Sequence, residues 1–384
     1  MRVLLTIWVD AAWHPVVTFT SQMLSERGDA VHILYRQPES RSAIPGSADF
    51  GANAALWPVA GWDGRWRNQA AYLRFLMRAV VLARRIRPDV IIGYDMHGVA
   101  AAYLASLAHP SSKLVYHNLD LAPKETLTAY ARAVKALEGV AARSAGLVVF
   151  SAPGRAAIFK REAGLQREPL VVMNCQRLAV PQMDTGALRQ LLDSRGLHFD
   201  RLIVRLGSLG PNHGVETTIR SMQEWKGNWG LILVGVPIPS YLQSLQELID
   251  SLHQTQEVVT LPAVPYSLWY DCLYSADLGI ALYEPGNINH AHMAGAGNKL
   301  SLYLKAGIPS IVPDFPDFAA FVQKYGAGKV ANPADPSSIA AAINAVFAGD
   351  AEYVALCQSA AAAFQTEFNF EKQFEPVLSW LNRT

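Results

Sequence analysis

The sequence has few cysteines, no excess of charge and no long hydrophobic run. Only 3 of its 384 residues are cysteine, and Cys175, Cys272 and Cys357 form no CxxC or Cys/His cluster, so we expect reduced thiols and no metal site. Because 33 Lys and Arg are balanced by 32 Asp and Glu, a general nucleic-acid coat is excluded, although a local patch is not. The first apolar run, 3–9, is too short for a signal peptide, and no run of 18 uncharged apolar residues follows. We therefore expect a cytoplasmic protein that spans no membrane.

The fingerprint GxGxxG of dinucleotide-binding oxidoreductases is also missing where it belongs. Those glycines follow the first strand, because the backbone there must approach a pyrophosphate closely. The loop after the first apolar run is DAAWHP, which contains no glycine. The sequence therefore gives no support to a dinucleotide oxidoreductase.

Short apolar runs alternate with helical segments in both halves of the chain. With 51% apolar and 17% charged residues, the composition supplies packed cores. Such alternation builds parallel sheets with helices on both faces, so we predict an α/β protein with two Rossmann-like domains facing each other across a cleft. We assign residues 1–180 to the first domain, about 181–197 to a linker and 198–365 to the second. Strands are expected within 1–10, 30–36, 89–94, 113–118, 146–151, 201–210, 230–235, 258–263, 277–283 and 309–314.

Two features of the second half point to an anion. A glycine-rich turn, GSLGPNHG (207–214), follows the strand at 201–210, and its main-chain N–H groups suit a phosphate, although a tight connection alone explains it equally well. Lys299 lies in the first turn of a helix that ends at Gly307, where acids are the usual choice. That lysine either expects an anion or is an ordinary surface residue.

Four segments in order and spacing resemble the donor-binding half of family 4-like glycosyltransferases of the GT-B fold. These are GSLGPNHGVETTIRSM, SADLGIALYEP, NKLSLYLKAGIPSIVPD and GKVANPADPSSIAAAI, over residues 201–345, and the first half is similar more loosely through DVIIGYDMHG, KLVYHNLD and GLVVFSAP. The resemblance implies transfer of a sugar from a UDP- or GDP-linked donor to a hydroxyl of a glycan or glycolipid, with retention and without a cofactor or metal. It also implies that the last helix, 366–384, packs back on the first domain.

The resemblance places the donor diphosphate on the second domain. A leaving diphosphate needs a metal or fixed protein donors to stabilise its charge, and no clustered acids are present, so Lys299 is the donor we predict first. Glu284 resembles the first acid of the family's paired-Glu pattern and is predicted to contact the sugar, unless it is a plain loop acid. The predicted donor-binding residues are Gly207, Ser208, Leu209, Gly210, His213, Glu284, Gly297, Asn298, Lys299 and Leu302.

Three of these positions depart from the family pattern. Ser208 and His213 stand where members often carry Arg and Lys that hold the diphosphate, and Leu302 stands where a Glu binds ribose hydroxyls. A hydroxyl and an imidazole give a weaker permanent field than two cations. Two interpretations remain: a transferase with an atypical donor pocket, which we favour, and a catalytically silent nucleotide-sugar-binding protein that uses the same cleft.

The acceptor is expected on the first domain. His97 follows a buried strand, where the family often has a histidine near the donor sugar, and Asp10 in the first loop is positioned to act as a general base. In retaining members the departing phosphate oxygen is described as helping to deprotonate the acceptor, so no side chain need be an indispensable base. With Lys299, His97 and Asp10 form our catalytic set, and the predicted acceptor-binding residues are His14, Asn118, Asp120 and Glu138.

A basic and aromatic segment occupies residues 62–87. Its arginines at positions 67, 74, 78 and 85 fall on one helical stripe, and Trp62 and Trp66 precede them. This pattern suits peripheral docking on anionic lipid by an enzyme that acts on a lipid-linked saccharide. The alternative is a solvated face of a helix that packs on the sheet.

Overall fold

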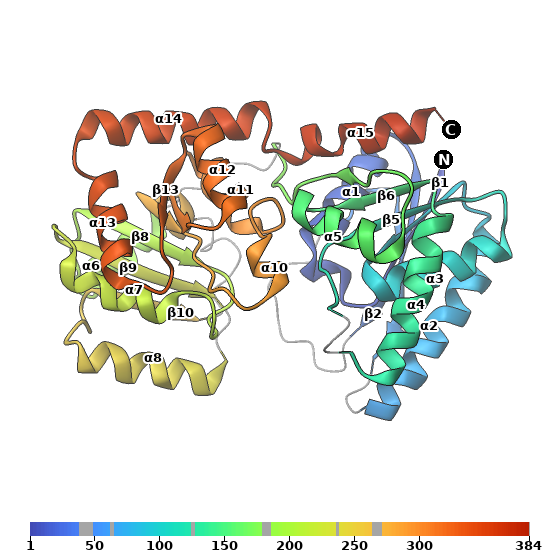
Figure 1. Ribbon diagram of the computed structural model, residues 1–384, viewed down its shortest axis with the longest axis horizontal. Coiled ribbons are helices and arrows are strands. Elements are labelled where there is room, and N and C mark those ends of the chain that lie inside the picture. Colours follow the sequence, from blue (N-terminus) through green and yellow to red (C-terminus); the bar gives the residue numbers. More distant parts are fainter. Residues whose placement is uncertain are drawn as a thin grey trace. The chain divides into compact units, whose positions relative to one another are not determined.

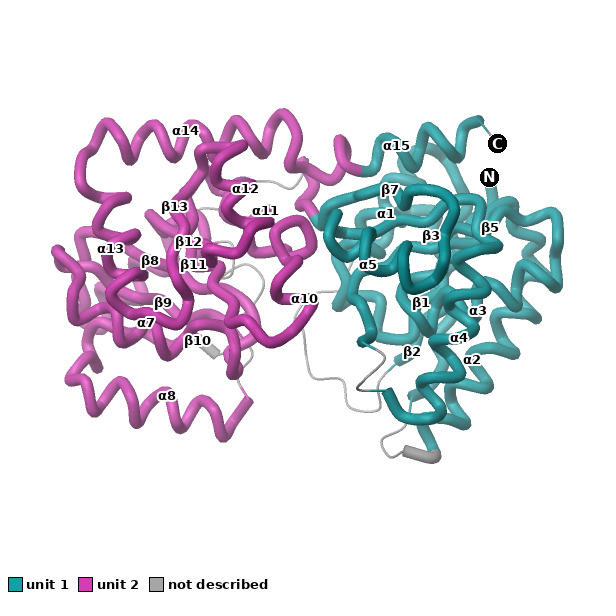
Figure 2. The backbone as a smooth tube through the Cα atoms, in the orientation of Figure 1, with its two compact units in different colours: residues 1–43, 47–174, 374–384 teal, residues 44–46, 175–373 magenta. Residues whose placement is uncertain are grey.

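The chain divides into two compact units, shown in two colours in Figure 2. The computed structural model describes residues 1–37, 49–61, 65–123, 127–178, 186–235, 238–262 and 271–383. Unit 1 contains the described residues up to Asn174 together with 374–383, and unit 2 contains the described residues of Cys175–Gln373. The division therefore falls at Asn174, and the predicted linker lies partly outside the described residues.

Unit 1 is built on a parallel sheet in the order β3-β2-β1-β4-β5-β6-β7 (Figure 1). Its first strand is buried from Val3 to Ile7, which explains the continuous apolar run. The strands are β1 (Arg2–Ile7), β2 (Ala30–Gln37), β3 (Ala54–Ala60), β4 (Val90–Tyr94), β5 (Lys113–Asn118), β6 (Leu147–Phe150) and β7 (Leu170–Val171).

Helices cover this sheet, and one of them lies unusually close to it. A Cβ on Gly98 would lie 2.3 Å from the carbonyl oxygen of Thr6, so only glycine lets helix α3 approach β1. The described part of unit 1 also receives the end of the last helix, where Trp380 lies against Gly146 and Asn382 accepts a hydrogen bond from Arg27 at 3.0 Å. The elements are the short η1 (Ala11–Trp13), α1 (Pro15–Glu26), α2 (Arg65–Ile86), α3 (Asp95–Ala108), α4 (Ala129–Ser144), α5 (Pro153–Ala163) and α15 (Phe370–Asn382).

Unit 2 repeats this architecture with the strand order β10-β9-β8-β11-β12-β13. Its strands are β8 (Arg201–Leu206), β9 (Trp229–Gly235), β10 (Val258–Pro262), β11 (Leu278–Ile280), β12 (Ser310–Pro313) and β13 (Gly328–Ala331). Its helices are α6 (Ala187–Ser194), α7 (Val215–Ser221), α8 (Pro239–Ser251), α10 (Ile288–Ala291), α11 (Asn298–Ala306), α12 (Pro316–Tyr325), α13 (Pro336–Val346) and α14 (Asp350–Thr366), with the short η3 (Met222–Glu224).

Each sheet has one switch point, which is the place where the strand order reverses direction: the first strands extend the sheet toward one edge, and the later strands extend it toward the opposite edge. It lies between β1 and β4 in unit 1 and between β8 and β11 in unit 2. In open α/β sheets, ligands bind beyond the carboxyl ends of the strands at this place. The two switch points therefore locate the candidate sites.

The predicted fold class is confirmed, because both sheets are parallel and covered by helices. Strand β3 was not predicted, because it contains Pro58 and proline disfavours strands. Since β3 lies at the edge of the sheet, proline is tolerated there. The segment SLWYDCLYSA (267–276) also has a helical pattern; residues 267–270 lie outside the described residues, and 271–274 are helical. No single described helix is long and apolar enough to cross a membrane, although α13 and the segment Asp350–Asn382, which are bent by 95° at the break between them, pass that test of length and composition together.

Candidate functional site

The glycine-rich turn 207–214 leaves the end of β8 at the switch point of unit 2. Gly207 and Gly214 have φ values of +102° and +63°, in a region of backbone conformation that residues with a Cβ atom seldom adopt. A Cβ on Gly235, at the end of β9, would lie 1.7 Å from the carbonyl oxygen of Gly207, so the two backbones touch there. The N–H of Glu284 donates to the carbonyl of Asn212 at 3.0 Å and ties the turn to the loop after β11. The turn is thus held in place from two neighbouring strands.

Lys299 reaches this turn from the start of helix α11. A Cβ on Gly207 would lie 3.1 Å from Cε and 3.4 Å from Nζ of Lys299, so glycine makes room for the ammonium group. Nζ donates to the hydroxyl of Tyr283 at 3.1 Å and lies 4.8 Å from the centre of that ring. Burial, and then the charge of Arg205, hold the pKa of Lys299 well below its usual value. An anion on the turn would supply the missing counter-charge.

Arg205 is a second cation at this turn, and the sequence analysis did not identify it. Its side chain is 1% exposed, and Nη1 donates to the carbonyls of Ser208 at 2.7 Å and Leu206 at 3.3 Å. Nη2 is buried and has no hydrogen-bond partner in the described part of the chain. An arginine inside the otherwise apolar strand RLIVRL was the available signal, because a buried guanidinium needs a reason.

The other predicted donor residues gather around these cations. Burial, and then the charges of Lys299, Arg205 and His290, lower the pKa of His213 to about 3, so its imidazole is neutral at pH 7. Its ring centre lies 5.9 Å from that of Tyr283. Nδ1 of His213 and Oδ1 of Asn298 are buried without a partner among the described residues. Both atoms are free to bind a polar ligand.

Leu302, Ser208 and Glu284 differ in their surroundings. Leu302 is 8% exposed in α11, so the position of the family's ribose-binding acid is an apolar core position here. Ser208 is exposed in the turn itself. Burial, and then the charge of Glu216, raise the pKa of Glu284. Glu284 therefore lies in a negative environment beside the cationic one.

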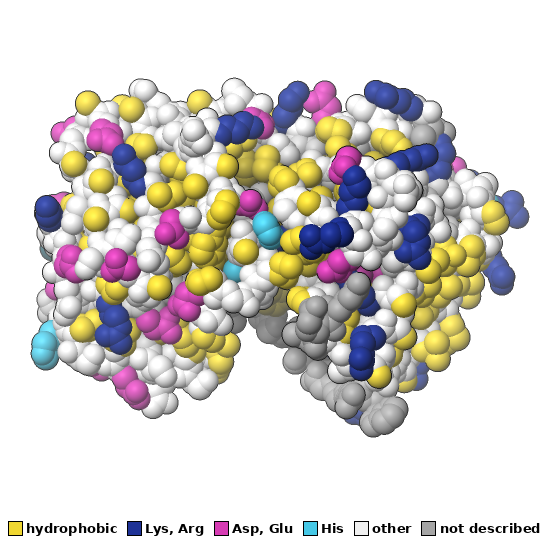
Figure 3. Space-filling model, in the orientation of Figure 1, with side chains coloured by type: hydrophobic (Ala, Val, Ile, Leu, Met, Phe, Trp, Pro, Cys, Tyr) yellow, Lys and Arg dark blue, Asp and Glu magenta, His cyan; other side chains and the backbone are white. Residues whose placement is uncertain are grey.

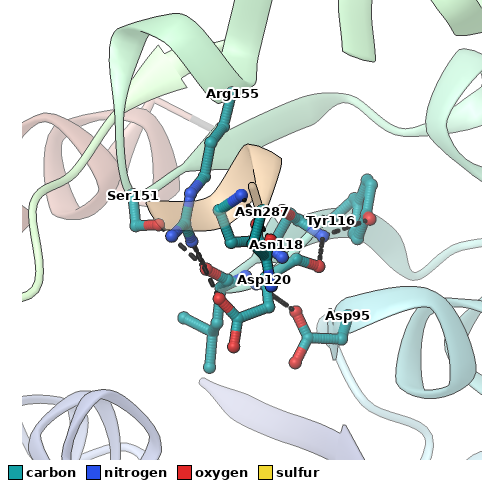
Figure 4. A network of polar contacts seen from close by, with 9 residues as sticks. Asp95, Tyr116, Asn118, Asp120, Ser151, Arg155 and Asn287 are labelled. Atoms are coloured by element: carbon teal, nitrogen blue, oxygen red, sulfur yellow. Dashed lines mark hydrogen bonds and ion pairs between the residues drawn. The ribbon is translucent and has the colours of Figure 1, made fainter. Parts of the chain in front are cut away.

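In unit 1, a polar network fixes the chain beyond β5 (Figure 4). Oδ1 of Asp95 accepts the N–H groups of Leu119 at 2.7 Å and Asp120 at 3.1 Å. The guanidinium of Arg155 is fully buried, donates to the carbonyl of Leu119 and forms an ion pair with Asp120 at 2.9 Å. Asn118 donates to the carbonyl of Asp120 at 2.9 Å. The network thus presents the carboxylate of Asp120, which is 68% exposed, in a fixed position.

Asp95, which holds the main chain of Leu119 and Asp120, has a strained backbone and a carboxyl group with a raised pKa. Its φ is +53°, a conformation that non-glycine residues seldom adopt, and it lets α3 begin directly after β4. Burial, and then the charge of Asp120, raise its pKa to about 7. Consequently His97 lies in the first turn of α3 and not in the loop where the sequence analysis expected it. The sequence analysis did not single out Asp95, because positive φ at a non-glycine residue has no reliable sequence signal.

His97, His14 and Asp10 lie at the same switch point. Burial lowers the pKa of His97 to about 4, and its ring packs edge-on against Tyr72 at 5.0 Å. Burial lowers the pKa of His14 too, opposed by the charges of Asp120 and then Asp10. Asp10 caps η1 by accepting the N–H of Ala12 at 3.1 Å. These side chains form a polar group at the ends of β1, β4 and β5.

Two predicted acceptor residues are less accessible. Glu138 is 1% exposed, pairs with Lys135 at 2.8 Å and accepts a hydrogen bond from Tyr116. Asn118 is fully buried and donates to the hydroxyl of Tyr116 at 2.9 Å. Both belong to the network that supports Asp120, so we do not include them among the groups that would touch an acceptor.

Comparison with known proteins supports the fold. No protein-family model matches the sequence, and no curated protein matches it significantly. Among solved structures, the Anabaena protein HepE in complex with UDP is 16% identical with a TM-score of 0.74, and each chain is covered completely. Sucrose-phosphate synthase from Thermosynechococcus elongatus is 14% identical with a TM-score of 0.77, over 100% of this chain and 98% of that one. The chain has the GT-B fold.

WaaG, a glycosyltransferase involved in lipopolysaccharide biosynthesis, has the same GT-B architecture at 13% identity and a TM-score of 0.64, over 98% of both chains. The predicted resemblance to GT-B glycosyltransferases is therefore confirmed at the level of fold. Within the described residues of this GT-B chain, no three His, Cys, Asp or Glu side chains are grouped to hold a metal ion. Cationic groups gather at the switch point of unit 2, and carboxylates gather at that of unit 1.

Proposed function

We propose that this GT-B chain transfers a sugar from a nucleoside-diphosphate sugar to a hydroxyl of a glycan or glycolipid. The observation that supports this most is the pair of cations at the glycine-rich turn. Lys299 and Arg205 approach the same turn, and neither forms an ion pair with a carboxylate in the described part of the chain. A buried guanidinium next to a half-buried ammonium group, neither of them in an ion pair, is costly unless a ligand supplies the opposite charge. A diphosphate has the charge and the acceptor oxygens to do so.

We propose that the diphosphate leaves without help from a metal. Its developing charge would be stabilised by Lys299, by Arg205 and by main-chain N–H groups of the turn, all fixed before the donor arrives. HepE structures that hold UDP or UDP-glucose provide a precedent for a donor of this class on the same fold. We propose a retaining reaction, in which the departing phosphate oxygen accepts the acceptor's proton.

We propose that the acceptor binds at the switch point of unit 1. Asp120 is held rigidly and is exposed, and the charges of both Asp120 and Asp10 act on His14. Carboxylates are good acceptors for sugar hydroxyls. His97 is neutral at pH 7, so it offers a hydrogen bond without a positive charge. These groups would orient the attacking hydroxyl.

The direct test is a nucleotide screen followed by a turnover assay. UDP and GDP should raise the melting temperature of the wild-type protein, because a ligand selective for the native state stabilises it. Lys299→Ala should weaken binding of the active nucleotide by about 1 to 3 kcal/mol. Lys329→Ala serves as the matched control and should leave nucleotide binding unchanged. Lys329 lies on β13, and its ammonium group already pairs with Glu352 at 2.7 Å. Equal affinity in the wild type and Lys299→Ala would contradict the proposed site.

A catalytically silent binding protein is the second candidate. It is favoured by Leu302, which is buried where a ribose-binding acid is expected, and by Ser208, which is exposed but uncharged. Release of nucleoside diphosphate from a panel of nucleotide-sugars with glycan acceptors separates the two functions. Binding with no release across the panel would favour the silent protein.

We further propose that unit 1 docks on anionic membranes, which suits a cytoplasmic enzyme with a lipid-linked acceptor. Figure 3 shows hydrophobic side chains gathered on the side of unit 1 that carries α2 and α3. On α2, Leu73, Met77 and Val81 are 58%, 54% and 61% exposed at helical spacing. Arg78 and Arg85 lie beside them and stack on Trp57 at 6.0 Å and 5.7 Å. Exposed apolar residues flanked by arginines fit an anionic interface.

Vesicle flotation tests the membrane proposal. The wild-type protein should float with phosphatidylglycerol vesicles and not with phosphatidylcholine vesicles. A Leu73→Ser and Met77→Ser double variant should lose most of this binding, because two apolar contacts are removed. Val354→Ser changes a residue of α14 that is 50% exposed and should bind as the wild type does. Unchanged flotation of the double variant would contradict the assignment of this face.

A further inference from the structure

We propose that Arg205 replaces, from beneath the turn, the diphosphate-binding cation that is missing at Ser208. This inference rests on the proposed function, because it names a further residue of the donor site. The position three residues later in the chain, Ser208, is exposed and uncharged. Arg205 itself sits on β8, one residue before the strand ends at Leu206.

The guanidinium of Arg205 lies against the main chain of Ser208, the residue whose own side chain has no charge. Nη1 donates to the carbonyl of Ser208 at 2.7 Å, so the guanidinium lies directly against the main chain of that residue. The carbonyl of Leu206, on the other side of Gly207, accepts a second bond from Nη1 at 3.3 Å. Arg205 therefore binds the carbonyl groups on both sides of Gly207, and the side chain of Lys299 packs against this same glycine.

The surroundings of Arg205 do not explain it as a structural ion pair. Its side chain is 1% exposed, and Nη2 has no hydrogen-bond partner among the described residues. Of the groups that interact with it electrostatically, Glu216 is a carboxylate, but within the described chain no carboxylate lies within ion-pair distance of Arg205. A buried guanidinium held in this way is unfavourable until an anion is nearby.

The second cation also restores the charge that the turn would otherwise lack. His213 is neutral, because burial and then the charges of Lys299 and Arg205 lower its pKa to about 3. Lys299 would then be alone opposite a diphosphate. With Arg205, two cations act on the turn, and they act through a buried, low-dielectric region where their field is weakly screened. Arg205 is thus a positioning residue that orients the turn and attracts the diphosphate.

Binding of a graded series of ligands tests the proposal. Calorimetry would measure UDP, GDP, inorganic pyrophosphate and the matching nucleoside on the wild type, Arg205→Met, Arg205→Lys and Arg205→Gln. We expect Arg205→Met to bind pyrophosphate and the active nucleotide about tenfold to a hundredfold more weakly, because a hydrogen bond or ion contact to a charged group is lost. Affinity for the nucleoside should stay within about twofold, because it carries no phosphate.

The other variants separate charge from folding. Arg205→Lys should recover part of the loss, since it keeps the charge, whereas Arg205→Gln keeps a donor for Ser208 but not the charge and should stay weak. Arg205→Gln carries the test if Arg205→Met does not fold. Arg201→Met is the matched control, because Arg201 lies on the same strand and pairs with Asp277 at 3.0 Å.

Two results would overturn the inference. One is pyrophosphate binding by Arg205→Met or Arg205→Gln within twofold of the wild type. The other is an equal loss of nucleoside and nucleotide binding, which would make Arg205 a purely structural residue. Failure of the wild type to bind any nucleotide would instead refute the proposed function, so the two failures are distinguishable.

Discussion

The carboxyl group of Asp95 provides a quantitative test of the acceptor-side geometry. Its Oδ1 accepts two main-chain N–H groups, while burial, and then the charge of Asp120, raise its pKa from 3.8 to about 7. Asparagine keeps an acceptor oxygen and tolerates the φ of +53° better than most residues. Asp95→Asn therefore removes the titration and leaves the local geometry in place.

The sign follows from the raised pKa. Between about pH 4 and pH 7 the native protein holds a proton that the unfolded chain has released, so this group makes the wild type less stable as pH rises. One proton changes the free energy of unfolding by about 1.4 kcal/mol per pH unit. From pH 5 to pH 7 the wild type should lose roughly 2 kcal/mol relative to Asp95→Asn, because the native carboxyl is already half deprotonated at pH 7. Other groups titrate in both proteins and cancel in the difference.

Urea unfolding at pH 5, 6, 7 and 8, with the transition of unit 1 followed, measures this difference. The stability of Asp95→Asn relative to the wild type should grow up to pH 7 and level off above it. Asp89→Asn is the matched control, because Asp89 also accepts a main-chain N–H, from Arg2 at 2.7 Å, but is exposed. A difference that is independent of pH for Asp95→Asn would refute the reasoning.

Two further predictions concern the turn and the histidine. Gly235→Ala should cost more than about 3 kcal/mol of stability and abolish UDP binding, because its Cβ would collide with the carbonyl oxygen of Gly207. Gly349→Ala is the control, because there is open space around Gly349, and it should change stability by less than about 0.5 kcal/mol. Urea unfolding measures the stability of both variants, and calorimetry measures their binding of UDP. His97→Gln should lower turnover without changing its pH dependence between pH 6 and 8, because the pKa of about 4 keeps His97 neutral throughout; a shifted pH profile of product release would contradict this.

The architecture could be predicted from the sequence because it depends on repeated local patterns. Buried parallel strands read as continuous apolar runs, and β1 and β8 were found in this way. Strand β3 was missed because Pro58 lowers strand propensity, and only its place at the sheet edge makes proline acceptable. Position in a sheet is a tertiary property that the local sequence does not show.

The candidate site could be predicted only where a residue follows a strand in an obvious loop. Lys299 and the glycine-rich turn met that condition, and the structure brings them together. Arg205 did not meet that condition, because it belongs to strand β8 and contacts the turn only through a hydrogen bond from its guanidinium to the carbonyl of Ser208. Asp95 did not either, since its role depends on a positive φ and on the main chain of Leu119, which lies 24 residues away.

The opposite charges of the two switch points give the proposed reaction a physical basis. Unit 2 places Lys299 and Arg205 at its switch point, whereas unit 1 places Asp10 and Asp120 at its own. A diphosphate is stabilised by the first environment and repelled by the second, while a neutral sugar hydroxyl binds readily to carboxylates. In the proposed reaction the charged leaving group therefore belongs with unit 2 and the uncharged nucleophile with unit 1. If so, Lys299→Ala should weaken binding of a nucleoside diphosphate and leave binding of a neutral glycan unchanged, which calorimetry with each ligand measures.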